Sequence, residues 1–303
     1  MPVFTQNPDP RSLVERPADD LLAAGTRMGA VELLVRNLDA MIAFYSSGVT
    51  LEVLEQVGET AVLGRAGHPL VRLRRVPDLP PRRPGEAGLF HTAVLFDDKP
   101  ALAAAVASVA THAPRSFTGS ADHLYSEAFY FDDPEGNGVE LYVDRPRESW
   151  QRDANGLLQT ATNPLDPNAF LRANLAAPSS GSAGPPATLG HVHLQVGDIG
   201  AARDFYVDAL GFEVMSDLGS ALFIAAGGYH HHIAVNTWGT AGAGPRAAAL
   251  GLGQVNIALP DDDDVAALRQ RLTDHGVGVR HDGAVLRFDD PWGTLIQVEA
   301  TGA

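Results

Sequence analysis

The feature that most constrains the fold is an internal repeat. Residues 28–45 (MGAVELLVRNLDAMIAFY) align without gaps with residues 189–206 (LGHVHLQVGDIGAARDFY), and each stretch runs from an alternating apolar strand through a polar turn to a Phe-Tyr pair. Residues 88–96 (GLFHTAVLF) match residues 251–259 (GLGQVNIAL) in the same way. Repeats of this kind indicate a chain assembled from copies of one supersecondary unit.

The repeated unit has the order strand, helix, then two or three strands. Ala-rich helices are expected at 99–112 and 261–275, and the matching turns FDDPEGN (131–137) and FDDPWGT (288–294) each separate two strands, as Asp-Pro-x-Gly chemistry predicts. The unit occurs four times, at roughly 28–77, 87–146, 189–240 and 250–301. We therefore predict an α+β fold, with four βαβββ modules paired into two cupped mixed β-sheet (half-barrel) domains and helices on the outside.

The domain boundaries follow from the repeat. We expect an N-terminal arm at 1–27, a first domain of two modules at 28–146, a linker at 147–188, and a second domain of two modules at 189–301. Within the linker, the Pro-, Gly- and Ser-rich run 177–186 predicts a flexible connection, and a short helix is expected at 166–175.

Composition excludes several classes of protein. The chain of 303 residues has a formal net charge of −15, which disfavours binding to nucleic acid or to anionic membranes. It has no Cys, so thiolate ligands and cysteine nucleophiles are excluded. No window reaches the length of an apolar membrane span, and the polar N-terminus lacks the pattern of a secretory signal, so we expect a cytoplasmic protein.

Polar residues interrupt the predicted strands on one face only. Alternation within the strands at 191–196, 230–236 and 139–143 directs the apolar residues towards the helices and the polar ones to the other face. We take this second face as the concave one, and it carries His91, Glu140, Tyr142, His191, His193, Gln195, His230, His232 and Asn236. Contact with water is the simplest explanation for any one of them, because antiparallel sheets commonly have a solvated face.

Four segments carry a resemblance to a known family: GLFHTAVLF, SADHLYSEAFYFDDPEGNGVELYVDRP, LGHVHLQVGDI and GGYHHHIAVNTW. They resemble the vicinal oxygen chelate superfamily of glyoxalase I, fosfomycin and bleomycin resistance proteins and extradiol dioxygenases, and most of all its two-domain catechol 2,3-dioxygenase-like branch. The resemblance covers about 28–300. In this superfamily, metal ligands lie on the first and last strands of paired modules, and extradiol enzymes use two His and one Glu, which leave coordination positions open.

In the N-terminal half, the resemblance implies that His91 and Glu140 are metal ligands. It implies that His123 is the acid/base histidine and that Tyr130 hydrogen-bonds the substrate hydroxyl. The second His ligand is expected at position 30, where this chain has Ala30. Glu32 has the same face but lies further along the strand, so this triad is incomplete.

In the C-terminal half, the resemblance implies metal ligands at His191 and His232. Gln254 and Gln297 stand where a His and a Glu are expected, and Glu299 shares the face of Gln297. These Gln and Glu residues, with Glu32, are weaker metal candidates, so this half either holds a metal or has lost the site.

Other residues on the concave face are candidates for substrate contact rather than metal binding: His193, His230, Asn236 and Tyr142. His231, on the helix side of its predicted strand, is interpreted as structural. The run Asp261–Asp264 resembles a metal trap, but at the start of a helix it is better explained as a cap.

The resemblance implies a ring-cleaving extradiol dioxygenase that binds a divalent metal, Fe(II) or else Mn(II), a small aromatic substrate and dioxygen. His91 and Glu140, or else His191 and His232, would hold the metal. Two alternatives stay open: a non-catalytic binding protein of the bleomycin-resistance type, and another metal reaction on the same scaffold. Four modules in one chain allow a monomer, and a homodimer is the other option.

Overall fold

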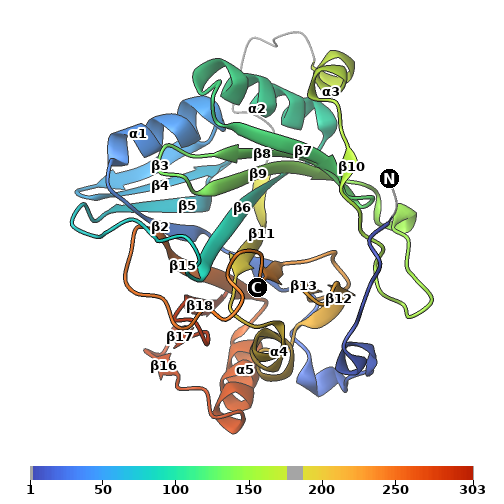
Figure 1. The fold of residues 1–303 in the computed structure, drawn as a ribbon. Coiled ribbons are helices and arrows are strands. Elements are labelled where there is room, and N and C mark those ends of the chain that lie inside the picture. The colour runs from blue at the N-terminus through green and yellow to red at the C-terminus, as the bar shows by residue number, and fades with distance from the viewer. Residues whose placement is uncertain (1–2, 176–186, 303) are drawn as a thin grey trace.

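The computed structural model describes residues 3–175 and 187–302, and it contains the four predicted modules (Figure 1). The first module comprises β2 (Val31–Val35), α1 (Leu38–Ala43), β3 (Glu52–Val57), β4 (Thr60–Arg65) and β5 (His68–Arg75). The second comprises β6 (Gly88–Phe96), α2 (Lys99–His112), β7 (Phe117–Asp122), β8 (Ser126–Asp132) and β9 (Gly138–Asp144).

The second half repeats this order. The third module comprises β11 (Ala187–Gln195), α4 (Ile199–Arg203), β12 (Glu213–Asp217), β13 (Ala221–Ala225) and β14 (Ile233–Asn236). The fourth comprises β15 (Gly251–Leu259), α5 (Asp262–Asp274), β16 (Arg280–His281), β17 (Val285–Asp289) and β18 (Leu295–Ala300).

Short elements lie between and before the modules. The linker contains β10 (Asn163–Pro164) and α3 (Pro167–Asn174), which confirms the predicted helix. The linker run 177–186 lies outside the described residues. Two 3₁₀ turns, η1 (Pro10–Leu13) and η2 (Ala18–Asp20), and the two-residue strand β1 (Arg27–Met28) precede the first module.

The modules pair differently from the sequence halves. Two nine-stranded mixed sheets form, each from one module of either half. The first and fourth modules form one sheet, here the outer-module sheet, in which β2 pairs antiparallel with β15. The second and third form the inner-module sheet, in which β6 pairs antiparallel with β11. The expectation that each half forms its own cup is therefore wrong, although the cupped mixed sheets with external helices are as predicted.

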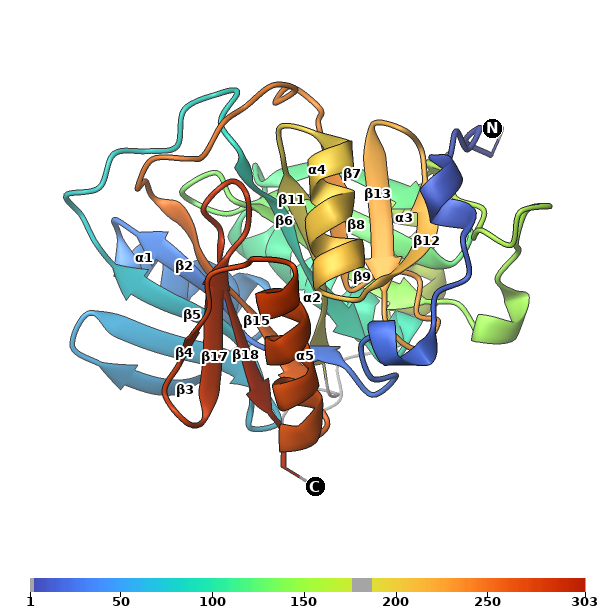
Figure 2. The same ribbon diagram turned by 90° about the horizontal axis from the view of Figure 1, so that it is seen from below.

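Each sequence half is instead held together on the helix side. In the first half, the Tyr45 hydroxyl lies 3.3 Å from Oδ2 of Asp133, and in the second half the Tyr206 hydroxyl donates to Oδ2 of Asp290 at 2.8 Å. The two tyrosines end the repeated Phe-Tyr segments, and the two aspartates begin the repeated Asp-Pro-x-Gly turns. Figure 2 shows the helices α4 and α5 of the second half on the same side of the molecule, one following the other. The two strongest repeat motifs thus serve to dock neighbouring modules.

Capping residues explain where the helices begin. Each of the four module helices starts after a strand at an Asn or Asp whose side chain accepts a backbone N–H of the first turn: Asn37, Asp98, Asp198 and Asp261. Asp261 accepts from the amide of Asp264 at 2.9 Å, so the capping interpretation of the acidic run is confirmed. No helix in the part of the chain that the structure describes is long and apolar enough to cross a membrane.

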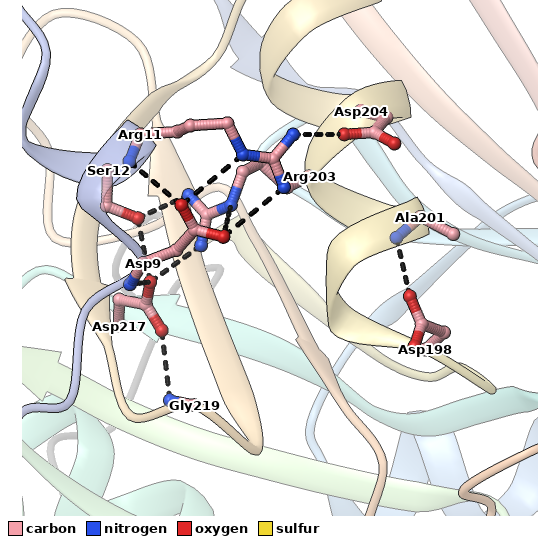
Figure 3. Close-up of polar contacts among 9 residues, drawn as sticks. All are labelled: Asp9, Arg11, Ser12, Asp198, Ala201, Arg203, Asp204, Asp217 and Gly219. Carbon is pink, nitrogen blue, oxygen red and sulfur yellow. Dashed lines mark hydrogen bonds and ion pairs between the residues drawn. The ribbon is translucent and has the colours of Figure 1, made fainter.

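The N-terminal arm is hydrogen-bonded to a buried ion pair of the third module (Figure 3). Arg203 of α4 is almost fully buried, and its Nη2 donates to Oδ2 of Asp217 on β12 at 2.6 Å. The same Asp217 oxygen accepts the amide of Asp9 at 3.0 Å and the hydroxyl of Ser12 at 2.7 Å. Arg11 adds an exposed pair with Asp204. The arm is therefore part of the folded unit.

Candidate metal centre

Side chains from three neighbouring strands meet on the concave face of the inner-module sheet. Ala93 on β6 lies opposite Glu140 on the parallel strand β9 and opposite His191 on the antiparallel strand β11. His91 comes two residues before Ala93 and therefore shares its face. Because Ala93 carries only a methyl group, the longer side chains on either side can reach each other across it.

Glu140 lies between two imidazoles. Its Oε2 is 2.9 Å from Nε2 of His91 and 3.1 Å from Nε2 of His191. One ligand atom of each residue lies within 4.8 Å of those of the other two, and all three side chains are buried. Two histidines and a carboxylate are the donor set of the facial triad, which binds iron(II) and leaves positions open for other ligands.

The second histidine of this triad comes from the other half of the chain. The sequence predicts it at Ala30 and, failing that, predicts His191 paired with His232. Both expectations rest on cups formed within the halves, and the module pairing overturns them: His191 stands in the third module at the place that Ala30 has in the first. We use the name triad for His91, Glu140 and His191 from here on.

The triad suits a metal ion chemically. Nε2 of His91 is close to Glu140 but not aligned for a hydrogen bond, and it has no hydrogen-bond partner among residues 3–175 and 187–302. Burial opposes ionisation of Glu140, yet His191 and His91 hold its pKa well below the usual range. Burial lowers the pKa of His191 to about 4. At neutral pH the site therefore offers a carboxylate and a neutral imidazole, the forms that bind metals.

His123 and Tyr130 lie side by side next to the triad. Tyr130 on β8 is the cross-strand neighbour of Glu140, and His123 follows the end of β7. Nδ1 of His123 donates to the carbonyl oxygen of Ala161 at 2.6 Å, so Nε2 of the neutral ring is an acceptor, and it lies 2.6 Å from the Tyr130 hydroxyl. The structure thus brings together His123 and Tyr130, the two residues that the resemblance places next to the substrate.

The protonation states of this pair are set by burial. Burial lowers the pKa of His123, so the imidazole is neutral at pH 7. Burial, followed by the charge of Glu140, raises the pKa of Tyr130 well above its ordinary value, so the phenol keeps its proton. The site therefore has a proton acceptor and a hydroxyl donor in contact, 2.6 Å apart.

His193 and Asn236 form a second pair on the same face. The amide of Trp238 donates to Oδ1 of Asn236 at 2.8 Å, so the Asn236 Nδ2 is the donor towards Nε2 of His193 at 2.9 Å. The His193 ring lies 4.9 Å from the ring of His91, centroid to centroid. Both predicted substrate-contact residues are thus beside the triad, and the half-exposed Phe90 and Trp238 rings pack on His193.

The three consecutive histidines differ from expectation. The strand β14 begins only at Ile233, so alternation does not extend back to 230–232. His232 is not in the triad: its Nδ1 accepts the Ala226 amide at 3.2 Å, and its assignment as a last-strand ligand is wrong in this geometry. His231, interpreted as structural, instead packs against His191 with ring centroids 4.0 Å apart. His230 is buried and its Nε2 donates to Asp144 at 2.9 Å.

Tyr142 packs against the His191 ring of the triad. Its ring lies 4.9 Å from that of His191, and its hydroxyl is hydrogen-bonded to the hydroxyl of Tyr229 at 2.8 Å. Gly190 makes room for this hydroxyl, because a Cβ there would be 1.7 Å from it. Since Tyr142 is fully buried and its hydroxyl is already paired, we revise its role from substrate contact to support of His191.

The weaker metal candidates all lie in the outer-module sheet, and three of the four have other partners. Glu32 is paired with Arg74 at 2.9 Å, and Oε1 of Gln297 accepts from Nε of Arg287 at 3.0 Å. The Gln254 amide donates to Asn256 instead of facing an open site. Neither these residues nor Glu299 belongs to a group with metal-ligand spacing among the described residues.

Sequence reasoning missed three residues that complete the site: Ala161, Asp144 and Tyr229. Each acts through a contact between segments distant in the sequence, with His123, His230 and Tyr142 respectively. Ala161 contributes only its backbone carbonyl, so its residue type carries no signal. Asp144 and Tyr229 are polar residues next to motif strands, which is the only local indication of a role.

Comparison with sequences of known families gives one description for both halves. The model of the Glyoxalase/Bleomycin resistance protein/Dioxygenase superfamily matches residues 27–141 and 188–298. A curated relative, the catechol-2,3-dioxygenase of Bacillus subtilis (strain 168), is 35% identical over 274 residues, which are 88% of this chain and 94% of the relative.

Solved structures agree on the fold. A putative dioxygenase from Bacillus subtilis subsp. subtilis str. 168 superposes with a TM-score of 0.63 at 15% identity, covering 90% of this chain and 84% of that one. Glyoxalase I from Zea mays superposes with a TM-score of 0.57 at 17% identity, covering 91% and 92%. At such identities these likenesses concern the fold alone.

Proposed function

Since the chain belongs to the glyoxalase/bleomycin resistance protein/dioxygenase superfamily, we propose that it is an extradiol dioxygenase, which cleaves the ring of a small catechol with dioxygen. The 35% identical relative named as a catechol-2,3-dioxygenase supports this activity over the others in the superfamily. The proposed metal is Fe(II), with Mn(II) as the second choice.

One observation carries the proposal: pairing of the second and third modules brings His191 to His91 and Glu140. The binding-protein alternative rests on an incomplete triad, and that feature disappears once the ligand comes from the other half. Two imidazoles and one carboxylate are the donor set expected for a non-haem iron(II) oxygenase.

The proposed reaction balances without an added reductant. A ring carbon–carbon bond next to the two hydroxyls breaks, and both atoms of dioxygen enter the open-chain product. When bound at the triad, the metal supplies open positions at which the two catechol oxygens and dioxygen come together. The remaining tasks are proton transfer and orientation of the substrate, which fall to the chain's own residues.

We assign these tasks to His123 and Tyr130. Nε2 of neutral His123 here accepts from the Tyr130 hydroxyl; once a catechol hydroxyl replaces that donor, His123 can take its proton and later return it to the product. Ala161 fixes the tautomer that this role requires. Tyr130 keeps its proton and donates a hydrogen bond that orients the substrate oxygen.

The rest of the concave face has supporting roles. His193, held by Asn236, lies beside His91, so we propose that it contacts the substrate or dioxygen. The aromatic rings of Phe90 and Trp238 at its exposed side suit a flat substrate. A cytoplasmic location and a monomer or homodimer stay predictions.

The test is oxygen uptake by protein purified without a tag or chelator, loaded anaerobically with Fe(II) and then mixed with catechol in air. We expect consumption of one dioxygen per catechol and appearance of a coloured ring-opened product. Protein that binds Fe(II) at the triad but neither consumes oxygen nor alters a panel of catechols would contradict the proposal.

A further inference from the structure

A second group of imidazoles adjoins the triad on the side away from Glu140. One ring nitrogen each of His191, His230 and His231 lies within 4.8 Å of the other two, and all three residues are buried. Ring centroids of His191 and His231 are 4.0 Å apart, and those of His230 and His231 are 4.5 Å apart. The proposed reaction uses neither His230 nor His231.

The orientation of His230 suits a ligand. Its Nε2 donates to the carboxylate of Asp144, so Nδ1 of the neutral ring carries a lone pair. This Nδ1 accepts a hydrogen bond of 2.7 Å from Nδ1–H of His231, a bond that a bound cation would replace. Tyr125 stacks on the His230 ring at 4.7 Å with an interplanar angle of 15°, which holds the ring in place. A histidine oriented through its second nitrogen by a carboxylate is the usual arrangement around a bound metal.

His191 contributes the third nitrogen. Its Nε2 faces Glu140, which leaves Nδ1 for the neighbouring histidines. That Nδ1 is buried and has no hydrogen-bond partner within the ranges that the structure describes. An unpartnered polar atom in the interior is destabilising, so its presence here calls for an explanation. A metal ion beside the three rings satisfies it.

We propose that His191, His230 and His231 form a second metal site, made only of imidazoles, that takes a divalent cation of the zinc or copper class. Three nitrogen ligands without a carboxylate favour these softer ions over iron(II) and manganese(II). The two sites share His191, and a neutral imidazole has one lone pair. Zinc at the second site therefore competes with iron at the triad.

Equilibrium dialysis with zinc sulfate tests the site in the full chain. In Glu140→Gln, which weakens the triad, we expect about one zinc per chain to remain, bound mostly by imidazoles. Adding His231→Gln to this variant is expected to lower zinc affinity at least tenfold, about the loss that even an outer-sphere change causes. His232→Gln is the matched control: it alters the adjacent histidine, which lies outside the group, and leaves zinc affinity unchanged.

X-ray absorption of zinc bound to Glu140→Gln protein is a second measurement that needs no change in the cluster. Three imidazoles around the zinc are expected from the second site, whereas the altered triad supplies two. The inference is overturned if Glu140→Gln binds no zinc, if fewer than three imidazoles are found, or if correctly folded His231→Gln protein binds zinc as before. Ring cleavage by the iron-loaded wild type is measured separately, so failure of one proposal leaves the other testable.

Discussion

The inner-module and outer-module sheets have the same strand order at their centres, β9-β6-β11 in one and β18-β15-β2 in the other, but opposite chemistry. The repeat places Gln254 at the position of His91, Gln297 at that of Glu140 and Ala30 at that of His191. Every member of the triad thus has a counterpart that cannot serve as a strong metal ligand.

The difference extends to the surrounding residues. Arg287 is the cross-strand neighbour of Gln297 as Tyr130 is of Glu140, and the pair Glu32–Arg74 corresponds to His193–Asn236. The outer-module sheet has charged side chains with polar partners where the inner-module sheet has neutral ones. The same arrangement of strands therefore carries a candidate metal centre in one sheet and none in the described part of the other, which teaches that the sheet pairing decides which repeat positions can act together.

Glu140→Gln is expected to have the largest effect on activity, and it tests the difference between the two sheets. Loss of the carboxylate removes the metal and with it several kcal/mol of transition-state stabilisation, so catechol cleavage is expected to fall by roughly 1000-fold or more. Iron content by elemental analysis should fall with it. The control is Gln297→Glu at the matching position of the outer sheet, which should leave activity as it is. Equal losses in both variants would break the distinction between the sheets.

His123→Gln is expected to have the next largest effect. Removal of a general acid/base lowers kcat about 100- to 10,000-fold, while iron content is retained. The base form of His123 is the active one, and burial lowers its pKa below 6.5, so wild-type kcat/KM falls as the pH drops through that lowered pKa. The variant should lack this acid limb. Arg280→Gln, at an exposed position of the outer-module sheet, should change activity by less than about twofold; an unchanged pH profile in His123→Gln would assign the proton transfer elsewhere.

Tyr130→Phe tests the Tyr130 hydroxyl. The outer-module sheet has no such hydroxyl, because Arg287 stands at the matching position. The substitution removes one hydrogen bond to the substrate, worth about 1 kcal/mol, so kcat/KM for catechol is expected to fall roughly fivefold with metal content unchanged. Arg287→Gln is the control and should be without effect on kinetics. A Tyr130→Phe variant that loses its iron would show that the tyrosine acts on the triad rather than on the substrate.

The smallest effect is expected at the tyrosine–aspartate contact that holds the two modules of each sequence half together. Tyr206→Phe removes the 2.8 Å bond to Asp290, and Tyr45→Phe removes the longer 3.3 Å contact with Asp133. We expect the free energy of unfolding, from urea titration, to fall by about 1–2 kcal/mol in the first variant and by less than about 1 kcal/mol in the second. Identical values would mean that both halves are docked equally tightly on the helix side.

Much of the fold can be predicted from the sequence because its signals are local. Strand alternation, Asn or Asp caps and the Asp-Pro-x-Gly turns each act over a few residues, and Gly136 and Gly293 have the positive φ angles that these turns require. The same turns give the register of Glu140 four residues later. His91, Glu140 and His191 were each identified as metal ligands through the resemblance to the superfamily that their segments carry.

Their association could not be predicted in this way. The first strands of all four modules have edges with the same hydrogen-bonding groups, so alternation does not say whether β6 pairs with β2 or with β11. The site depends on that choice, since His191 enters only through the second. His231 was missed for a related reason: a loop residue follows no periodicity, and only the late start of β14 turns it towards His191.

The pairing of the first module with the fourth has a consequence for biosynthesis. A ribosome releases the N-terminus first, so β2 must wait for β15, more than 200 residues later in the chain, before its sheet can close. Such distant contacts slow folding and leave strand edges exposed meanwhile. The inner-module sheet needs only residues up to Asn236, so the three residues of the triad can come together while the last module is still being translated.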